Sequence, residues 1–288
     1  PLYYRCDAQS VLFGSELKAL RAFPQWQPEL DRDALAAYMR HGYVPAPRTI
    51  YREVYKLPPG QILTLGAADR PELHAYWDLR EIARQGVASA RAAERDPQAA
   101  VAELEQLLRD AVRRNMIADV PLGAFLSGGI DSSAVAALMQ AESARPIKSF
   151  SIGFREPGFD EAPHARKIAQ HLGTDHTELY VEPRQAFDLI PSLPDHYDEP
   201  FADSSQLPTL LISRLARRHV TVALSGDGGD EVFGGYPRYF AAGALTGVAA
   251  LHGQGTPGWT SDALQPIAFR SLGPSLTTGR ISDIAVDP

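Results

Sequence analysis

The sequence predicts an α/β protein whose main domain is a doubly wound parallel sheet, preceded by a smaller β-rich region. Between positions 99 and 240, short strand-like runs with apolar residues alternate with helical stretches, the first of which has apolar residues at helical spacing. Two of the apolar runs lead directly into segments rich in glycine, serine and aspartate. Repeated strand–helix units form parallel sheets with helices on both faces, and such sheets bind ligands at the carboxyl ends of their strands.

The first 80 residues are expected to be mainly strands and turns. Strands are predicted over 1–5, 10–13 and 61–65, a turn over 57–60, and short helices over 15–20 and 31–40. Residues 81–98 are rich in Ala, Arg and Gln without a long apolar face, and we interpret them as a linker. Residues 241–288 are rich in Gly, Ala, Pro, Ser and Thr, and we interpret them as an atypical or truncated, loosely packed tail.

The main domain is expected to alternate strands and helices. Strands are predicted over 120–126, 147–154, 176–181 and 220–224. Helices are predicted over 101–112, 134–139, 161–172, 184–197 and 209–219, although Pro191 and Pro194 should interrupt the fourth of them.

The first polar segment is SGGIDSS at positions 127–133, between the strand 120–126 and a helical stretch. Its glycines allow a tight turn and a close approach of backbone to ligand, and the N–H groups at a helix start favour an anion. Asp131 adds a carboxylate that Mg²⁺ can share with a phosphate. Since no G-x-x-x-x-G-K-[ST] sequence occurs in the chain, we interpret the loop as a pyrophosphate site of an enzyme that splits ATP into AMP and pyrophosphate.

The second segment is SGDGGDE at positions 225–231, directly after the strand 220–224. Carboxyl ends of parallel strands lie at one edge of a sheet. The two loops are therefore expected to face one ligand, with Asp131 and Asp230 sharing a magnesium ion. A calcium loop is the alternative, but the spacing does not fit an EF-hand.

Bulk composition narrows the class of protein. The 288 residues are 44% hydrophobic and 22% charged, which is ordinary for a globular protein. The net charge of −7 does not indicate binding to nucleic acid or to an anionic membrane. The sequence shows neither a stretch of transmembrane length nor a signal peptide, and its single cysteine excludes an intramolecular disulfide. We expect a soluble cytoplasmic protein, and the start at Pro1 suggests a piece of a longer chain.

Together these motifs resemble the glutamine-hydrolysing asparagine synthetases of the asparagine synthase B type. SGGIDSS is similar to that family's pyrophosphate loop, SGDGGDEVFGGY to its second nucleotide loop, and DEPFADSSQLPT at 198–209 to the segment between them. PLYY, FGSELKAL and LPPG in the first 60 residues resemble the last third of its glutaminase domain. The resemblance covers residues 1 to about 240 in family order. It implies an adenine nucleotide α-hydrolase-like sheet in an ATP-pyrophosphatase (asparagine synthase) domain over 99–240. The C-terminal part of an N-terminal-nucleophile glutamine amidotransferase domain would occupy 1–80.

The resemblance implies a reaction and a set of residues. The reaction is aspartate + ATP + glutamine or ammonia → asparagine + AMP + pyrophosphate through β-aspartyl-AMP, with ATP and Mg²⁺ bound and a homodimer as the assembly. Nucleotide and pyrophosphate binding is carried over by position to Leu126, Ser127, Gly128, Gly129, Asp131, Ser132, Ser133, Ile152, Ser225 and Gly226. Asp131 and Asp230 would hold Mg²⁺, and Asp227 would support formation or breakdown of the intermediate.

The sequence departs from the family pattern at three points. Cys6 is internal, whereas the family's glutaminase uses an N-terminal cysteine whose own α-amino group is the base, so no glutaminase activity is expected. The lysines, at 18, 56, 148 and 167, all precede the second loop, whereas the family has a downstream lysine. The tail after Phe240 does not resemble the family's helical C-terminal half.

Two other functions remain open at this point. One is a related synthetase that adenylates another carboxylate, of the β-lactam-forming or peptide-cyclising kind. The other is a non-catalytic remnant that binds nucleotide. Asp203, Ser204 and Ser205 either touch substrate or cap the following helix. His164, His171 and His176 are expected at the surface or at helix ends.

Overall fold

The computed structural model describes residues 2–7, 10–66, 71–92, 96–155, 160–233 and 235–236. The chain divides into two compact units. The first contains Pro1–Ala102 and Leu189–Asp203, and the second contains Glu103–Asp188 and Ser204–Pro288. The expected tail over 241–288 lies outside the described residues.

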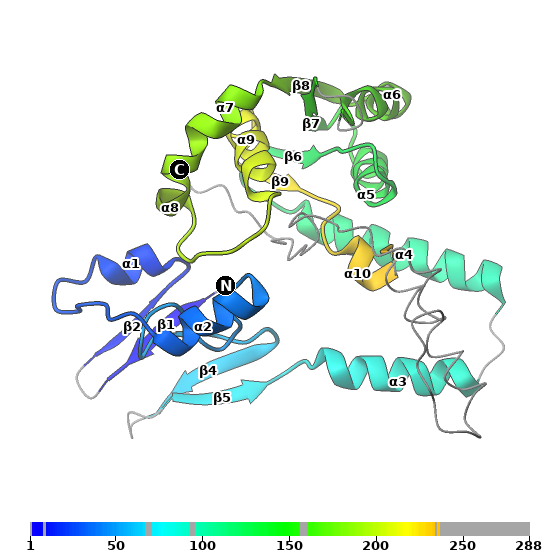
Figure 1. Ribbon diagram of the computed structural model, residues 1–288. Helices are drawn as coiled ribbons and strands as arrows, with labels where there is room; N and C mark the ends of the chain where they lie inside the picture. The colour runs from blue at the N-terminus through cyan, green and yellow to red at the C-terminus, as the bar shows by residue number, and fades with distance from the viewer. Residues whose placement is uncertain are drawn as a thin grey trace, which may run out of the picture. The chain divides into compact units, whose positions relative to one another are not determined.

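The first unit is built on a small antiparallel sheet in the order β2-β1-β3 and a separate hairpin of β4 and β5 (Figure 1). The strands are β1 (Tyr3–Cys6), β2 (Val11–Gly14), β3 (Tyr55–Lys56), β4 (Gln61–Leu65) and β5 (Pro71–Ala75). The helices that begin in this unit are α1 (Leu17–Arg21), α2 (Arg32–His41), α3 (Leu79–Ala92) and α4 (Pro97–Asn115).

The apolar core of the first unit joins α1 and α2 to β1 and to the segment before β3. Its buried residues are Tyr3, Leu17, Leu20, Trp26, Ala34, Val44, Ile50 and Val54. Helix α2 shows why the sequence forms a helix here. The Asp31 carboxylate accepts a hydrogen bond from the Asp33 amide at 2.9 Å, and Gly42 ends the helix with φ of 79°.

Several sequence expectations for this unit change. The helix predicted over 31–40 is present as α2, whereas β3 and β5 were not predicted. The segment 81–98, interpreted as a linker, contains most of α3 and the start of α4. The side chains of Leu79, Ile82 and Val87 on α3 are exposed. The helix has no buried apolar face, which is the feature that usually identifies a helix in a sequence.

The second unit holds a parallel sheet with the strand order β8-β7-β6-β9. Its strands are β6 (Leu122–Phe125), β7 (Lys148–Phe154), β8 (Asp175–Val181) and β9 (Val222–Leu224). Its helices include α5 (Ile130–Ala141), α6 (Ala162–Leu172), α7 (Pro183–Leu189), α9 (Gln206–Ala216) and α10 (Gly229–Phe233). Figure 1 shows α5 and α6 on one side of the sheet and α9 on the other, which confirms the predicted doubly wound fold.

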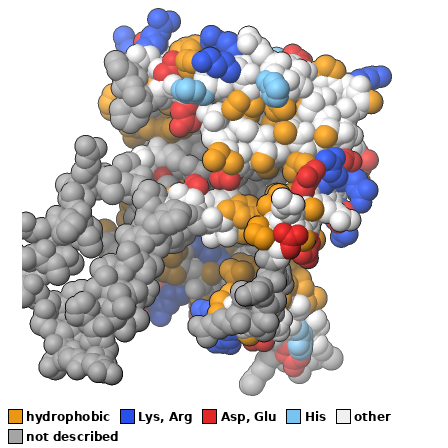
Figure 2. Space-filling model, turned by 90° about the vertical axis from the view of Figure 1, so that its right-hand side faces the viewer, with side chains coloured by type: hydrophobic (Ala, Val, Ile, Leu, Met, Phe, Trp, Pro, Cys, Tyr) orange, Lys and Arg blue, Asp and Glu red, His pale blue; other side chains and the backbone are white. Residues whose placement is uncertain are grey.

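Alternation along the strands produces two separate apolar layers. On one face, Ala124 and Leu126 pack with Met139 of α5 and with Ala165 of α6. On the other face, Phe150 packs with residues of α9 and with Val220, and its side chain is fully buried. On the α5–α6 face, Figure 2 shows acidic and basic side chains next to one another.

The strand order places a topological switch between β6 and β9. From β6 the chain moves to β7 and β8 on one side, and it returns to β9 on the other side. The two strands are paired in parallel, with Gly123 opposite Ala223 and Ala124 opposite Leu224. In open α/β sheets, ligands bind outside the carboxyl ends of the strands at such a point.

The helix predicted over 184–197 is interrupted, as its prolines require. It consists of α7, a 3₁₀ turn (Ile190–Ser192) and the short helix α8 (Leu193–His196). In the part of the chain that the structure describes, no helix is both long and apolar enough to cross a membrane.

The segment Leu189–Asp203 packs with the first unit through two neighbouring carboxylates. Asp198 accepts hydrogen bonds from the amides of Leu17 at 2.7 Å and Lys18 at 3.2 Å. Glu199 accepts from the Ile50 amide at 2.7 Å and forms an ion pair with Lys56 at 2.5 Å. These contacts join residues that are far apart in the sequence.

Burial controls the chemistry of the Glu199 carboxylate. Its side chain is only 11% exposed and that of Lys56 is 15% exposed. Burial raises the pKa of Glu199, and the hydrogen bond from Lys56 opposes that rise. Burial, with Glu199 and Asp198 nearby, also raises the pKa of Tyr3.

Candidate nucleotide site

The two glycine-rich loops touch each other at the switch point. A Cβ atom on Gly226 would lie 2.5 Å from the amide nitrogen of Ser132 and 2.8 Å from the carbonyl carbon of Asp131. A Cβ atom on Gly229 would lie 2.7 and 2.8 Å from the carboxylate oxygens of Asp131. Such distances are too short for a side chain, so the loops come this close because these positions are glycine.

Hydroxyl groups shape the first loop from within. The Ser132 hydroxyl accepts a hydrogen bond from the Ser127 amide at 3.2 Å and lies 3.0 Å from the Ser127 hydroxyl. It also lies 3.2 Å from the carbonyl oxygen of Gly129, and the Ser133 hydroxyl donates to the same oxygen at 2.6 Å. These bonds fold the loop around the start of α5, for which Gly129 is the N-cap residue.

The other residues carried over from the sequence fall into different environments. Leu126 is 1% exposed and belongs to the apolar layer beneath the loop. Ile152 is partly buried on β7. Gly128 has φ of 85°, a conformation that glycine adopts without strain. In the second loop, the Asp227 amide donates to the Ser225 hydroxyl at 3.3 Å.

The carboxylates of Asp131 and Asp230 are the residues on these loops that could hold a magnesium ion jointly with phosphate. The Asp131 carboxylate lies against Gly229, the residue that precedes Asp230, and the carboxylate of Asp230 lies against Gly235. Among the described residues, no group of three or more His, Cys, Asp or Glu side chains could hold a metal on its own. Proteins usually bind Mg²⁺ through one or two carboxylates together with phosphate and water, so Asp131, which lies against the second loop, is a candidate ligand.

The sequence interpretation missed a third element beside the first loop. A Cβ atom on Gly128 would lie 2.8 Å from Cβ of His164 and 3.0 Å from the amide nitrogen of Ala165. The first turn of α6 therefore packs directly against the loop. The sequence could not predict this contact between α6 and the loop, because 36 positions separate Gly128 from His164.

A polar cluster on the α6 face of the sheet was also missed. His176 lies between the hydroxyls of Ser149 at 2.7 Å and Ser151 at 3.2 Å, and it is therefore not the surface residue expected from the sequence. Burial lowers the pKa of His176. Glu178, two positions along β8, forms hydrogen bonds with Arg166 that lower the pKa of its carboxyl. Strand alternation would have placed His176 and Glu178 on one face.

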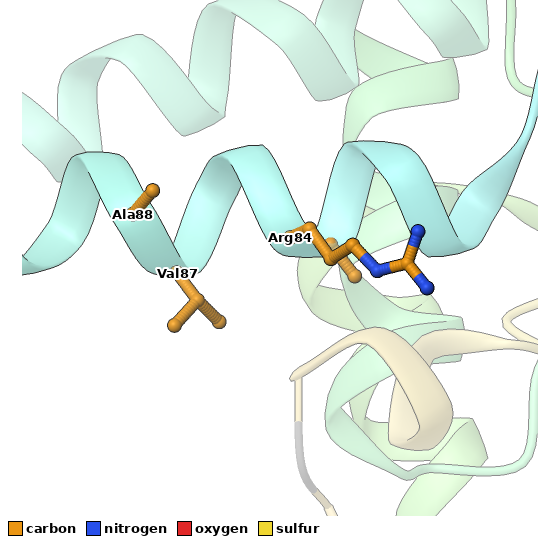
Figure 3. A pocket seen from close by; sticks show the side chains of 4 residues that line it. Arg84, Val87 and Ala88 are labelled. Carbon is orange, nitrogen blue, oxygen red and sulfur yellow. The ribbon is translucent and has the colours of Figure 1, made fainter.

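A separate hollow lies on α3 in the first unit (Figure 3). It is lined by Ala83, Arg84, Val87 and Ala88. None of these residues belongs to the glycine-rich loops, so the hollow adds nothing to the candidate site.

Comparison with known proteins identifies the family. A family model described as asparagine synthase matches residues 103–279, which include both glycine-rich loops and continue past position 240. The chain belongs to the asparagine synthase family. A second family model, described as a glutamine amidotransferase domain, matches residues 1–77.

Two relatives illustrate the similarity. A Methanocaldococcus jannaschii protein named "Putative asparagine synthetase 2 (glutamine-hydrolyzing)" is 39% identical over 241 residues, covering 82% of this chain and 45% of the relative. Glutamine-hydrolyzing asparagine synthetase 1 of Bacillus subtilis is 35% identical over 239 residues, covering 83% of this chain and 36% of the relative. The chain thus spans less than half the length of these asparagine synthase relatives.

One solved structure is also similar in part. It is an NH₃-dependent NAD synthetase from Campylobacter jejuni, with a TM-score of 0.35 and 12% identity. The similarity covers 46% of this chain and 59% of that chain.

Proposed function

We propose that the two glycine-rich loops bind ATP with Mg²⁺ and form the ATP-pyrophosphatase site of an amide-forming ligase. The reaction is aspartate + ATP + glutamine or ammonia → asparagine + AMP + pyrophosphate. The observation that supports this most strongly is the contact of the loops at the switch point, where Gly226 meets Ser132 and Gly229 meets Asp131. The family and its named relatives support the choice of reaction.

Each part of the site has a role in this proposal. Backbone amides and hydroxyls of Ser127, Gly129 and Ser132 surround the pyrophosphate portion of ATP, because small donors suit a polyanion. Asp131 and Asp230 hold Mg²⁺, which would offset negative charge on the phosphates. Asp227 follows Ser225 and Gly226 in the second loop and supports formation or breakdown of the adenylated carboxylate.

The proposal is tested by isotope exchange between labelled pyrophosphate and ATP. Adenylation that is reversible returns label from pyrophosphate to ATP only when the carboxylate substrate is present. We expect exchange that requires aspartate and Mg²⁺ and that is reduced in Asp227→Asn. Exchange driven by a different carboxylate would favour the β-lactam-forming or peptide-cyclising kind of synthetase. Nucleotide binding without exchange for any carboxylate would favour a non-catalytic remnant.

A further inference from the structure

We infer that Asp160, Arg166, Glu178 and Tyr180 are positioning residues that hold the first turn of α6 against the pyrophosphate loop. None of them belongs to either glycine-rich loop. The inference rests on the proposed function, because it assumes that this loop binds the phosphates of ATP.

Helix α6 is in a position to control the loop. At Gly128 the loop has no room for a side chain, because His164 Cβ and the Ala165 amide occupy that space. Gly128 is also in the left-handed conformation. A shift of α6 toward the loop would collide with its backbone, and a shift away would remove the surface on which the loop rests.

The buried side chains of α6 are small, and its larger apolar side chains, Ile168 and Leu172, lie in later turns and are only partly buried against the core. The buried residues of α6 are Ala162, Ala165 and Ala169. Alanine buries little apolar area, and the stabilisation from burial scales with that area. The first turn of α6, which buries only Ala162 and Ala165, therefore depends more on polar contacts for its position.

The first polar contact is a bidentate ion pair between α6 and β8. Arg166 Nε donates to Glu178 Oε1 at 2.7 Å and Nη2 donates to Oε2 at 2.5 Å. The Glu178 side chain is 16% exposed and that of Arg166 is 47% exposed. Because both oxygens accept from one planar guanidinium, the pair fixes direction as well as distance.

The second polar contact holds the start of the helix. Asp160 Oδ1 accepts a hydrogen bond from the Ala162 amide at 3.2 Å, and the Tyr180 hydroxyl approaches Asp160 Oδ2 at 3.5 Å. Gly153 on β7 makes room for this arrangement, since a Cβ there would lie 2.7 Å from Tyr180 and 2.8 Å from Asp160. Glu178 and Tyr180 are two positions apart on β8, so both point to the face that α6 covers.

The test measures the affinity of the chain for ATP·Mg²⁺ by calorimetry, together with thermal unfolding. In Arg166→Met and in Glu178→Gln we expect the Kd for ATP·Mg²⁺ to rise about tenfold. The double variant should bind ATP·Mg²⁺ no more weakly than the weaker-binding single variant, because both changes remove the same ion pair. Tyr180→Phe removes only a hydroxyl and should give a smaller rise in the same direction.

A matched control separates positioning from general stability. Arg109 pairs with Glu142, the C-cap residue of α5, at 3.0 Å, and the side-chain exposures of 41% and 22% are close to those of the Arg166 pair. Arg109→Met should lower the unfolding temperature by a comparable amount and leave the Kd for ATP·Mg²⁺ within twofold of the unsubstituted chain.

The outcomes distinguish the inference from the proposed function. If the unsubstituted chain binds ATP·Mg²⁺ and the Arg166→Met and Glu178→Gln variants bind it within twofold as well, the inference is wrong and the proposed function stands. An equal loss of affinity in Arg109→Met would likewise overturn the inference. If the unsubstituted folded chain does not bind ATP·Mg²⁺, the proposed function fails and the inference fails with it.

Discussion

Replacement of Gly226 by alanine should separate the two loops and weaken nucleotide binding. The new Cβ would lie 2.5 Å from the Ser132 amide nitrogen, and the other close atoms are backbone atoms of Asp131 and Ser132. Non-bonded carbon atoms prefer about 3.5 Å or more, so the loops must move apart by about 1 Å. Backbone atoms cannot rotate out of the way as a flexible side chain can.

The expected magnitude follows from the cost of overpacking. Inserting a methyl group into a packed contact costs about 1–3 kcal/mol, which corresponds to about a 5- to 150-fold change in an equilibrium constant. If the loops can bind ATP·Mg²⁺ only when in contact, that cost opposes binding directly. The Kd should therefore rise by at least about fivefold.

A neighbouring glycine provides the control. Gly228 has φ of 91°, and among the described residues nothing beyond its chain neighbours would lie within 4 Å of a Cβ atom placed there. Gly228→Ala therefore introduces backbone strain of about 1–2 kcal/mol but no contact between loops. Calorimetric titration of both variants with ATP·Mg²⁺ makes the comparison. Binding by Gly226→Ala within twofold of the unsubstituted chain would refute the claim that contact of the loops forms the site.

Three further predictions concern stability. Lys56→Met should lower the free energy of unfolding in urea by about 3 kcal/mol, because it leaves the buried carboxylate of Glu199 without its cation, and adding Glu199→Gln should restore part of the loss. Burial holds the pKa of His176 below its usual value of 6.5. The contribution of His176 to stability should therefore be unchanged above pH 6.5 and should decrease as the pH falls below it, because the unfolded state binds the proton first. His176→Gln should make this decrease smaller. Gly86→Ala, at an open position in α3, should raise stability by about 1 kcal/mol, and an unchanged or lower urea midpoint would contradict it.

The parallel sheet could be predicted because its signals are local. Short strand-like runs with apolar residues mark β6, β7, β8 and β9, and helical segments separate them along the chain. The position of the two loops at one edge of the sheet was also expected, since both follow strands of one parallel sheet. The sequence could not show which atoms meet, because the glycines at 226 and 229 could equally have served only as turn residues.

The polar contacts that hold distant segments together could not be predicted in the same way. Asp198 and Glu199 bind Leu17, Ile50 and Lys56, which are more than 140 positions away in the sequence. Helix and strand periodicity describes only neighbouring residues and cannot predict such a contact. The short strand β3 (Tyr55–Lys56) exists because β1 lies beside it, not because two residues have a strand pattern of their own. Arg166 and Glu178 lie on different elements, so their pairing depends on how α6 crosses β8.

Calorimetric titration of the folded chain with ATP, in the presence and absence of Mg²⁺, tests the central claim most directly. The account predicts binding that requires Mg²⁺ and that is weakened in Asp131→Asn, because that carboxylate lies between the loops and would share the metal with phosphate. Binding of equal strength without Mg²⁺ would contradict the assigned role of Asp131 and Asp230. Absence of any nucleotide binding by a folded sample would contradict the assignment of the two loops as a nucleotide site.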